Sequence, residues 1–220
     1  MSRAEQLIQL RSQCIQCTAC EKISQTRRNV VFGEGNPDSP LMIIGEGPGD
    51  NEDKTGRPFV GRAGNMLEQA LIDNKLSRED VYIANTVKCR ACEIVNDKPK
   101  NRPPTDEETK NCRRWLEPQI DIIQPEVILC VGAPSAKNLI KKTFKITAER
   151  GIYFPCEYAR TAIATLHPAY ILRQQSQVSD GGYSLLVADI AKAWGAAVEL
   201  RKKGPKKPKP SQEKAQETLF

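Results

Sequence analysis

The sequence predicts an α/β fold, a three-layer α/β/α sandwich with a central, largely parallel four-stranded sheet. Four short apolar runs of strand character recur along the chain, at residues 41–44, 81–84, 127–131 and 161–165. Segments of helical character separate these runs, and this alternation is typical of a parallel sheet that helices cover on both faces. The carboxyl ends of parallel strands lie at one edge of such a sheet, where ligands usually bind.

Each helix is indicated by a local pattern. Residues 4–13 can form a helix at the start of the chain, and residues 65–71 look helical after a glycine-rich loop. Thr105, with Glu108 three residues later, forms a capping box that predicts the start of another helix. The last helix is predicted at about residues 184–200. Its apolar face consists of Leu185, Leu186, Ile190, Trp194 and Val198.

The composition is that of a single soluble domain. Of the 220 residues, 39% are hydrophobic and 27% are charged, which is ordinary for a globular protein. No apolar run is long enough to cross a membrane, and the N-terminus lacks the apolar core of a signal peptide. We therefore expect a cytoplasmic protein, and we also expect it to be a monomer.

The charge is concentrated after residue 200. Most of the formal net charge of +6 lies there, in a segment rich in Lys, Pro, Gly and Gln that cannot bury enough apolar surface to fold. We expect residues 1–200 to form the folded domain and residues 201–215 to form a basic, disordered linker. Attraction to a polyanion would come largely from this tail.

The connection at residues 45–64 is the strongest candidate for a functional loop. It joins a strand to a helix over about twenty residues, whereas such connections usually have about two to six. It contains six glycines, two prolines, four acidic side chains and Phe59, a composition that suits a shaped pocket. Three further loops leave the same sheet edge, and we expect all four to share one cleft. These three loops span residues 85–90, 132–135 and 166–170.

Eight cysteines in a cytoplasmic protein favour metal or cluster ligation over disulfides. Cys14 and Cys17 form a C-x2-C pair, whose two sulfurs can reach one metal centre. The candidates for the remaining ligands are Cys89, Cys92 and Cys112. Cys130 ends an apolar run and is expected to be a small core residue instead.

Four motifs follow one another along the chain. They are an N-terminal C-x2-C, GEGPGDNEDKTGRPFVGRAG after the first strand, Asn85 followed by KCR, and LHPAYILR. Together they resemble the family 4 uracil-DNA glycosylases, the iron-sulfur branch of the uracil-DNA glycosylase superfamily, over roughly residues 10–195. The resemblance implies a monofunctional hydrolase that flips uracil out of single- or double-stranded DNA and cleaves its N-glycosidic bond. The abasic site that this leaves would initiate base excision repair, and such a substrate would bring the protein to the nucleoid.

The resemblance implies roles for the pocket residues. Phe59 would stack on the uracil ring, and Asn85 would offer its amide donor and acceptor to the 4-oxo and N3–H edge of uracil. Gly47 would belong to the substrate-binding backbone. His167, the only histidine, would donate a hydrogen bond near uracil O2 and stabilise the leaving uracil anion. The residues alone also permit a core Phe, a strand-end turn Asn and a structural His.

The resemblance does not settle which residue activates water. Gly47 stands where other branches of the superfamily have an Asp. Glu46 and Glu52 are the catalytic candidates, which would either orient the hydrolytic water or hold neighbouring pocket residues. A carboxylate near the sugar could also stabilise an oxocarbenium-like transition state. Asp50 and Asp53 are the other nearby carboxylates, and capping of the turn is the usual role of such residues.

The LHPAYILR segment is implied to enter the minor groove of DNA. Leu172 would be the apolar wedge that fills the vacated base stack, and Arg173 would bind phosphate. Tyr170 and Ile171 are alternative wedges.

The resemblance also implies a structural [4Fe-4S] cluster. Its expected ligands are Cys14, Cys17, Cys89 and Cys112. Cys20 or Cys92 could replace an assigned ligand, and spacing alone also permits a zinc site with the same thiolates. The stretch between Cys89 and Cys112 is longer than in the family, which places an insertion at about residues 91–98.

The end of the chain, residues 216–220, resembles the pentapeptide by which bacterial repair and replication proteins dock on the sliding clamp. Leu219 and Phe220 would fill an apolar groove on the clamp, and Gln216 would form a hydrogen bond at its edge. The linker would then hold the folded domain close to DNA. An ordinary frayed C-terminus is the alternative.

Other functions are compatible with parts of the sequence. One is a non-catalytic iron-sulfur module that binds DNA and the clamp, and another is a relative that traps uracil-DNA covalently. The trapping branch uses a histidine in a basic inserted loop, whereas this chain has one histidine and lacks such an insert, which favours a turnover enzyme. A nucleotide-phosphate site is disfavoured, because no P-loop motif is present and Asp50 breaks the GxGxxG pattern.

Overall fold

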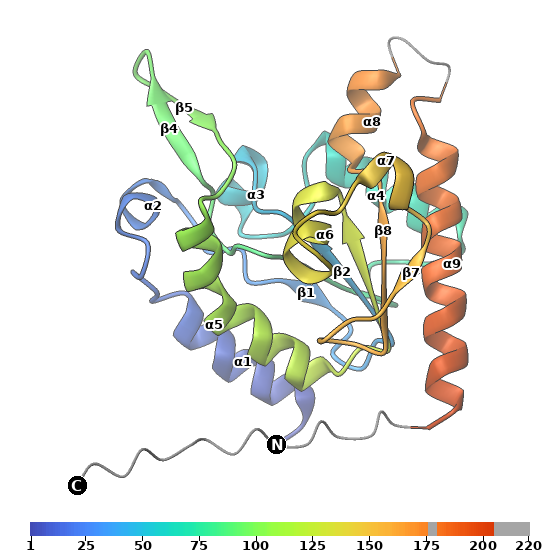
Figure 1. Ribbon diagram of the computed structural model, residues 1–220. Helices are drawn as coiled ribbons and strands as arrows, with labels where there is room; N and C mark the ends of the chain where they lie inside the picture. Colours follow the sequence, from blue (N-terminus) through green and yellow to red (C-terminus); the bar gives the residue numbers. More distant parts are fainter. Residues whose placement is uncertain (176–179, 205–220) are drawn as a thin grey trace, which may run out of the picture.

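The structure, a computed structural model, describes residues 1–175 and 180–204 (Figure 1). Within these residues the main sheet has the strand order β1-β3-β2-β6-β8-β7. Its four central strands are parallel to one another. They are β3 (Tyr82–Asn85), β2 (Leu41–Gly45), β6 (Val127–Val131) and β8 (Thr161–Thr165). The predicted α/β fold with a largely parallel sheet is confirmed.

Two short antiparallel strands extend this sheet beyond the four that the sequence predicts. β1 (Glu34–Gly35) pairs with β3, and β7 (Tyr153–Phe154) pairs with β8. Each has two residues, too few for an alternating apolar pattern to be recognised.

Helices cover both faces of the sheet, because both faces of its central strands are apolar. Met42, Ile44 and Ile128 point to the face covered by α1 (Arg3–Cys14), α5 (Asp106–Ile123) and α6 (Ala133–Leu139). Leu41, Ile43 and Leu129 point to the face covered by α4 (Arg62–Asp73), α8 (Pro168–Gln174) and α9 (Tyr183–Lys202). Alternate residues of one strand thus enter opposite cores. Cys130 is fully buried, as expected for a small core residue.

The helix boundaries follow the local signals closely. Thr105 Oγ1 accepts a hydrogen bond from the Glu108 backbone N–H at 3.1 Å, and Glu108 accepts one from the Thr105 N–H at 2.8 Å, so the predicted capping box starts α5. The last helix, α9, continues to Lys202, slightly past the predicted end. Three short helices complete the set within the described residues. They are α2 (Glu21–Thr26), α3 (Asp50–Thr55) and α7 (Ile146–Glu149).

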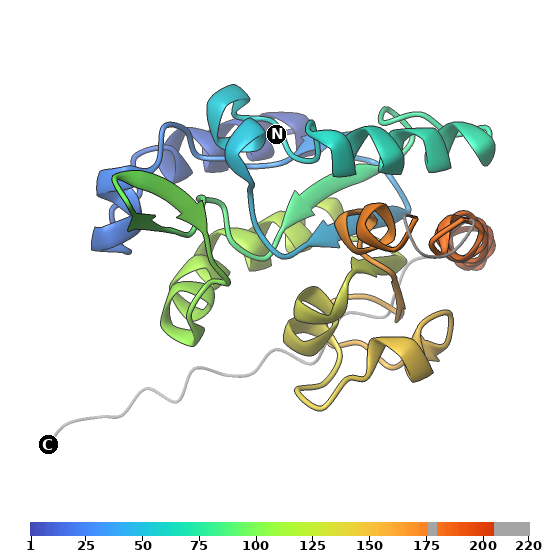
Figure 2. The same cartoon turned by 90° about the horizontal axis from the view of Figure 1, so that it is seen from above.

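Two segments project at the carboxyl edge of the parallel strands (Figures 1 and 2). The long connection after β2 contains α3, and the inserted segment forms an antiparallel hairpin of β4 (Cys92–Val95) and β5 (Lys98–Asn101). Asn96 and Asp97, between these strands, have positive φ angles of 51° and 58°. Such a pair is typical of a tight two-residue hairpin turn.

The proposed clamp peptide, with Gln216, Leu219 and Phe220, lies outside the described residues, as does the linker from residue 205 onwards. In the part of the chain that is described, no helix has the length and apolar character needed to span a membrane.

Candidate active site and cysteine pocket

A cavity of about 400 Å³ lies where β2 and β3 end. Its walls come from the long loop after β2, the end of β3, the start of α8 and the base of the β4–β5 hairpin. Among the predicted site residues, those that line it are Glu46, Gly47, Glu52, Phe59, Asn85 and His167. The sequence therefore located the cavity, and the fold brings together residues from three separate motifs.

Phe59 forms one wall of the cavity in an unusual backbone conformation. Its φ angle is 52°, a region that few residues other than glycine adopt, and its side chain is 6% exposed. Arg78 fixes this conformation by donating hydrogen bonds to the carbonyl oxygens of Pro58 at 2.5 Å and Phe59 at 3.2 Å. The Phe59 ring stacks against the His167 ring, with 6.0 Å between centroids.

Glycine is required where the loop meets these side chains. A Cβ atom on Gly45 would lie 2.4 Å from Asn85 Oδ1 and 2.5 Å from the Phe59 ring. A Cβ on Gly64 would lie 1.9 Å from the carbonyl oxygen of Phe59. Both contacts are far too close for real atoms, so the two glycines let the loop close tightly around the cavity.

Asn85 presents its side-chain amide to the cavity. The residue ends β3 and is 2% exposed, yet its amide has no hydrogen-bond partner among the described residues. A buried amide normally has such partners, because leaving it unpaired costs free energy. Asn85 therefore offers one donor and one acceptor to a bound molecule.

Glu52 organises the loop through backbone hydrogen bonds. Its carboxylate accepts hydrogen bonds from the backbone N–H groups of Gly49 at 3.0 Å, Val60 at 3.0 Å and Gly61 at 3.1 Å. This single side chain joins the start of α3 to the segment that carries Phe59.

The other two acidic residues of α3 are also engaged. Asp53 is buried and accepts hydrogen bonds from the backbone N–H groups of Arg28 at 2.9 Å and Asn29 at 3.3 Å. Asp50 forms ion pairs with Arg90 and Lys54. Both therefore stabilise the loop, as carboxylates at turns and helix starts often do.

Glu46 differs from these carboxylates. Its carboxylate lines the cavity, and within the described part of the chain no hydrogen bond or ion pair holds it. Burial raises the pKa of Glu46 above the ordinary value of 4.5. An unpaired carboxylate of this kind can accept a proton from water.

Gly47 has no side chain to act in this way. A Cβ on Gly47 would lie 2.6 Å from Cγ2 of Val87, so a larger residue would have to displace that side chain. The backbone of Gly47 lines the cavity instead.

His167 is held as a neutral imidazole. Its Nδ1 accepts a hydrogen bond from the Ala169 N–H at 3.1 Å at the start of α8, which leaves the proton on Nε2. Burial, followed by the positive charge of Arg173, lowers the pKa of His167 to about 4. The neutral Nε2–H can therefore donate a hydrogen bond within the cavity.

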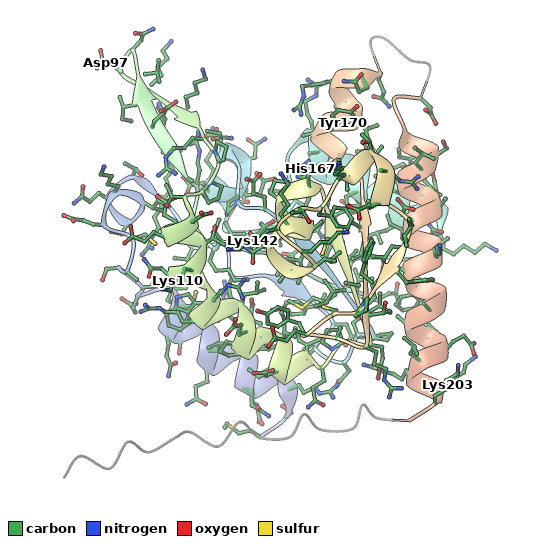
Figure 3. All side chains as sticks on the ribbon, viewed as in Figure 1. Asp97, Lys110, Lys142, His167, Tyr170 and Lys203 are labelled. Carbon is green, nitrogen blue, oxygen red and sulfur yellow. The ribbon has the colours of Figure 1, made fainter. Side chains whose placement is uncertain are left out.

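The other predicted DNA-contacting residues lie on α8 outside the cavity lining. Tyr170 and Arg173 are exposed and Leu172 is half-buried, whereas Ile171 is fully buried in the core. Figure 3 shows Tyr170 at the same end of the molecule as His167. Ile171 is thus unavailable as a wedge without loss of core packing.

A second pocket gathers five of the eight cysteines. They are Cys14, Cys17, Cys20, Cys89 and Cys112. Cys92 does not line this pocket, and its Sγ lies 3.7 Å from Thr26 Oγ1 instead. No group of three such ligands among the described residues is arranged to hold a single metal ion. An iron-sulfur cluster is a larger group that four thiolates hold together.

The surroundings of the thiols suit an anionic, sulfur-rich group. Arg27 donates a hydrogen bond to Cys89 Sγ at 3.2 Å, and the Lys88 N–H donates one to Cys112 Sγ at 3.1 Å. The indole N–H of Trp115, which also lines the pocket, is buried and has no partner in the described structure. Cations and N–H donors around sulfur are what such a cluster needs.

Lys88 links the two sites. It is fully buried, it lines the cysteine pocket, and its Nζ donates a hydrogen bond to the backbone oxygen of Asn85 at 3.0 Å. Burial lowers the pKa of Lys88 to about 8. Sequence reasoning did not identify Lys88, Arg78 or Trp115, although Lys88 stands in the KCR motif.

Comparison with known proteins gives the family of the chain. Residues 32–194 match the uracil DNA glycosylase superfamily. The type-4 uracil-DNA glycosylase of Thermotoga maritima is 44% identical over 80% of this chain and 88% of its own length. The type-4 enzyme of Sulfurisphaera tokodaii is 40% identical over 76% of this chain and 76% of its own length. That of Archaeoglobus fulgidus is 37% identical over 76% of this chain and 84% of its own length. The chain therefore belongs to the uracil DNA glycosylase superfamily, in its type-4 branch.

Proposed function

We propose that this chain is a monofunctional uracil-DNA glycosylase, which captures uracil outside the DNA helix and hydrolyses its N-glycosidic bond. Its relatives of 37–44% identity are named type-4 uracil-DNA glycosylases. The observation that carries the proposal is one cavity that combines an aromatic ring, an unpaired amide and a neutral imidazole. The product is an abasic site, the starting point of base excision repair.

Phe59 and Asn85 supply recognition in this proposal. The uracil ring stacks on Phe59, and the Asn85 amide pairs with the 4-oxo group and N3–H of uracil. Cytosine carries an amino group at position 4 and no proton on N3, so it mismatches an amide held in this orientation. The hydrogen bond from Lys88 Nζ to the backbone oxygen of Asn85 keeps that end of β3 in place.

His167 and Glu46 supply the chemistry. The bond between C1′ of deoxyribose and N1 of uracil breaks, and its electron pair leaves with the base. His167 Nε2–H donates a hydrogen bond to O2 of the leaving uracil anion and stabilises its charge. Glu46 accepts a proton from the water that attacks C1′, and its negative charge favours the oxocarbenium-like transition state.

Glu52 acts as a positioning residue in this scheme. Its carboxylate already accepts three backbone hydrogen bonds. It therefore maintains the loop geometry that places Phe59, while Glu46 is the carboxylate available to water.

We further propose that a [4Fe-4S] cluster occupies the cysteine pocket. Cys14, Cys17, Cys89 and Cys112 would hold it, and Cys20 is the alternative ligand that lines the same pocket. The cluster would tie the end of α1 to the segment after β3 and to α5. Because that segment continues from Asn85, the cluster stabilises the strand end that reads uracil.

DNA binding outside the cavity is assigned to α8 and to the tail. Tyr170 or Leu172 fills the vacated base stack, and Arg173 binds phosphate. The basic linker adds salt-sensitive affinity for DNA, which would place the protein at the nucleoid. The peptide at residues 216–220 docks on the sliding clamp. Deletion of this peptide should abolish clamp binding and spare uracil release from short oligonucleotides, and surviving clamp binding would refute the assignment.

The activity is tested with uracil-containing oligonucleotides, single-stranded and duplex, followed by alkali to cleave abasic sites. Iron-loaded protein should release uracil, and Asn85→Ala should lower the single-turnover rate by about 100-fold. Asn65→Ala, on the exposed side of α4, is the matched control and should retain the wild-type rate. Absence of uracil release by the wild-type protein would overturn the proposal.

A further inference from the structure

The β4–β5 hairpin is exposed on both of its faces. Every residue of its strands apart from Cys92 is solvent-exposed, including the apolar Ile94 at 60% and Val95 at 41%. A two-stranded hairpin without a core is at best marginally stable. A partner that covered one of these apolar side chains would remove its surface from water.

The hairpin is nevertheless anchored firmly at its base by Arg90. The Arg90 side chain is 7% exposed. Its guanidinium donates hydrogen bonds to Asn101 Oδ1 at 2.6 Å, Pro99 O at 3.3 Å and Asp50 Oδ1 at 2.6 Å. The hairpin is therefore tied directly to α3 in the active-site loop.

The base of the hairpin forms part of the cavity rim. Ala91, Asn101 and Arg102 line the same cavity as Phe59 and Asn85. Figures 1 and 2 show the hairpin rising on one side of this end of the molecule, with α8 on the other. A DNA strand whose flipped nucleobase enters the cavity would thus pass between the hairpin and α8.

The strand register places two free cations on one face of the hairpin. Val95 pairs with Lys98, and Glu93 pairs with Lys100, so these four side chains share a face. Neither lysine side chain forms an ion pair or hydrogen bond within the described residues. Both ammonium groups are available to an anionic partner.

We propose that the β4–β5 hairpin is a DNA-binding arm that contacts the DNA flanking the extrahelical uracil. Lys98 and Lys100 bind backbone phosphates, and Val95, on the same face, makes apolar contact with sugars or exposed base faces. Each four-residue strand extends about 13 Å, so the arm can reach DNA beyond the flipped nucleotide. This inference rests on the proposed glycosylase function, which requires DNA to reach the cavity.

The position of the arm favours DNA over a protein partner. The arm begins at the cavity rim, where the DNA on either side of the flipped nucleotide must lie. Glu93 and Asp97 balance Lys98 and Lys100 in net charge, but neither lysine is held in an ion pair with them, so each ammonium group can bind a phosphate at this position.

Binding of the full-length, iron-loaded protein to a duplex with an abasic-site analogue tests the arm. The double variant Lys98→Gln with Lys100→Gln should bind roughly tenfold more weakly at low salt, and the slope of log affinity against log salt should become shallower by about 2. The charge-matched control is Lys142→Gln with Lys145→Gln, at two exposed lysines that do not line the cavity. It should retain the wild-type affinity and slope.

Val95→Ser, on the face that carries both lysines, separates the apolar contact from the charge. It should weaken duplex binding by roughly threefold to tenfold and leave the salt slope unchanged. Wild-type affinity and slope in the lysine variant, together with wild-type affinity in Val95→Ser, would overturn the proposal and leave a protein partner for the exposed surface.

Uracil release from a trinucleotide distinguishes this proposal from the glycosylase function. Such a substrate fills the cavity but lacks most of the flanking DNA that the arm would contact, so the lysine variant should process it at close to the wild-type rate. Failure of the wild-type protein on this substrate would refute the glycosylase function. If the lysine variant lost activity equally on the trinucleotide and on the duplex, the DNA-binding role of the arm would be refuted.

Discussion

Lys88 Nζ donates a hydrogen bond to the backbone oxygen of Asn85 at 3.0 Å, and the same buried lysine lines the cysteine pocket. Its backbone N–H also donates a hydrogen bond to Cys112 Sγ at 3.1 Å. A fully buried ammonium group with one carbonyl partner is costly, unless a nearby negative charge offsets its desolvation. A cluster of thiolate-bound iron in the adjacent pocket would provide that charge.

We predict that Lys88→Met separates cluster retention from the stability of the polypeptide. Met preserves the apolar stem and removes the charge, so the cluster-free protein should be as stable as the wild type or more stable. The loaded protein should lose iron faster, with a faster decay of its absorbance near 400 nm, and should release uracil roughly tenfold more slowly. Lys137→Met, at an exposed lysine, is the control. Iron retention by Lys88→Met equal to that of this control would contradict the role of Lys88.

The sequence predicted the features that arise from local patterns. The runs at residues 41–44 and 127–131 are apolar on both faces, which identifies central parallel strands, and the Thr105 capping box identifies the start of α5. The length and composition of the loop at residues 45–64 located the cavity.

The contacts that fix the site could not be predicted in this way. Arg78 holds the Phe59 segment, and Arg90 holds the hairpin to Asp50, through contacts between residues distant in sequence. A single arginine carries no local signal of such a role. The hairpin also escaped prediction, because exposed strands lack an alternating apolar pattern, and the turn pair Asn96-Asp97 was the available clue.

Glu46→Gln should abolish most of the activity and preserve the fold. No hydrogen bond of its carboxylate would be lost in the described structure, whereas the proton acceptor would be removed, so the single-turnover rate should fall by about 100-fold. In the wild type, the rate should fall on acidification at a pH above the ordinary carboxylate value of 4.5, because burial raises the pKa of Glu46. The rate of the Glu46→Gln variant should not show this fall on acidification. A wild-type rate in Glu46→Gln would refute the assignment.

Glu52→Ala should act mainly on stability. It removes the acceptor of three backbone hydrogen bonds, and the free energy of unfolding should fall by about 2–3 kcal/mol in denaturant titrations. Activity should fall as well, because the Phe59 segment loses its support. Asp53→Asn, on the same helix, provides a comparison for the change in the free energy of unfolding. A Glu52→Ala protein with wild-type stability and low activity would instead favour a direct catalytic role.

His167 should remain neutral throughout the working pH range. With a pKa of about 4 in the folded protein against an ordinary 6.5, the unfolded chain takes up a proton first as the pH falls. Its contribution to stability is therefore constant above about pH 6.5 and decreases from there towards pH 4. His167→Gln should weaken this acid sensitivity, and uracil release should show no titration near pH 6.5. An NMR titration of the single histidine that gave a pKa near 6.5 would contradict the neutral donor.

The cysteine variants should separate ligands from bystanders by iron content. Cys92 lies outside the pocket, so Cys92→Ser should keep the wild-type iron content and visible absorbance. Cys17→Ser and Cys112→Ser should lose both. Cys20→Ser tests whether Cys20 replaces an assigned ligand, because Cys20 lines the pocket beside the four assigned ligands. Retention of iron by Cys17→Ser and its loss by Cys20→Ser would exchange their roles.

Two glycine-to-alanine substitutions in helices should have opposite effects. Alanine in a helix interior is ordinarily more favourable than glycine by about 1 kcal/mol. A Cβ added to Gly195, in α9, would have no atom of the described residues within 4 Å, so Gly195→Ala should raise the melting temperature. Gly64, in α4, would place its Cβ 1.9 Å from the Phe59 carbonyl oxygen. Gly64→Ala must therefore push away the segment that Arg78 holds, so it should lower both the melting temperature and the rate of uracil release. Equal stabilisation by the two substitutions would mean that the Phe59 segment moves freely, and that its left-handed backbone conformation is not needed to form the cavity wall.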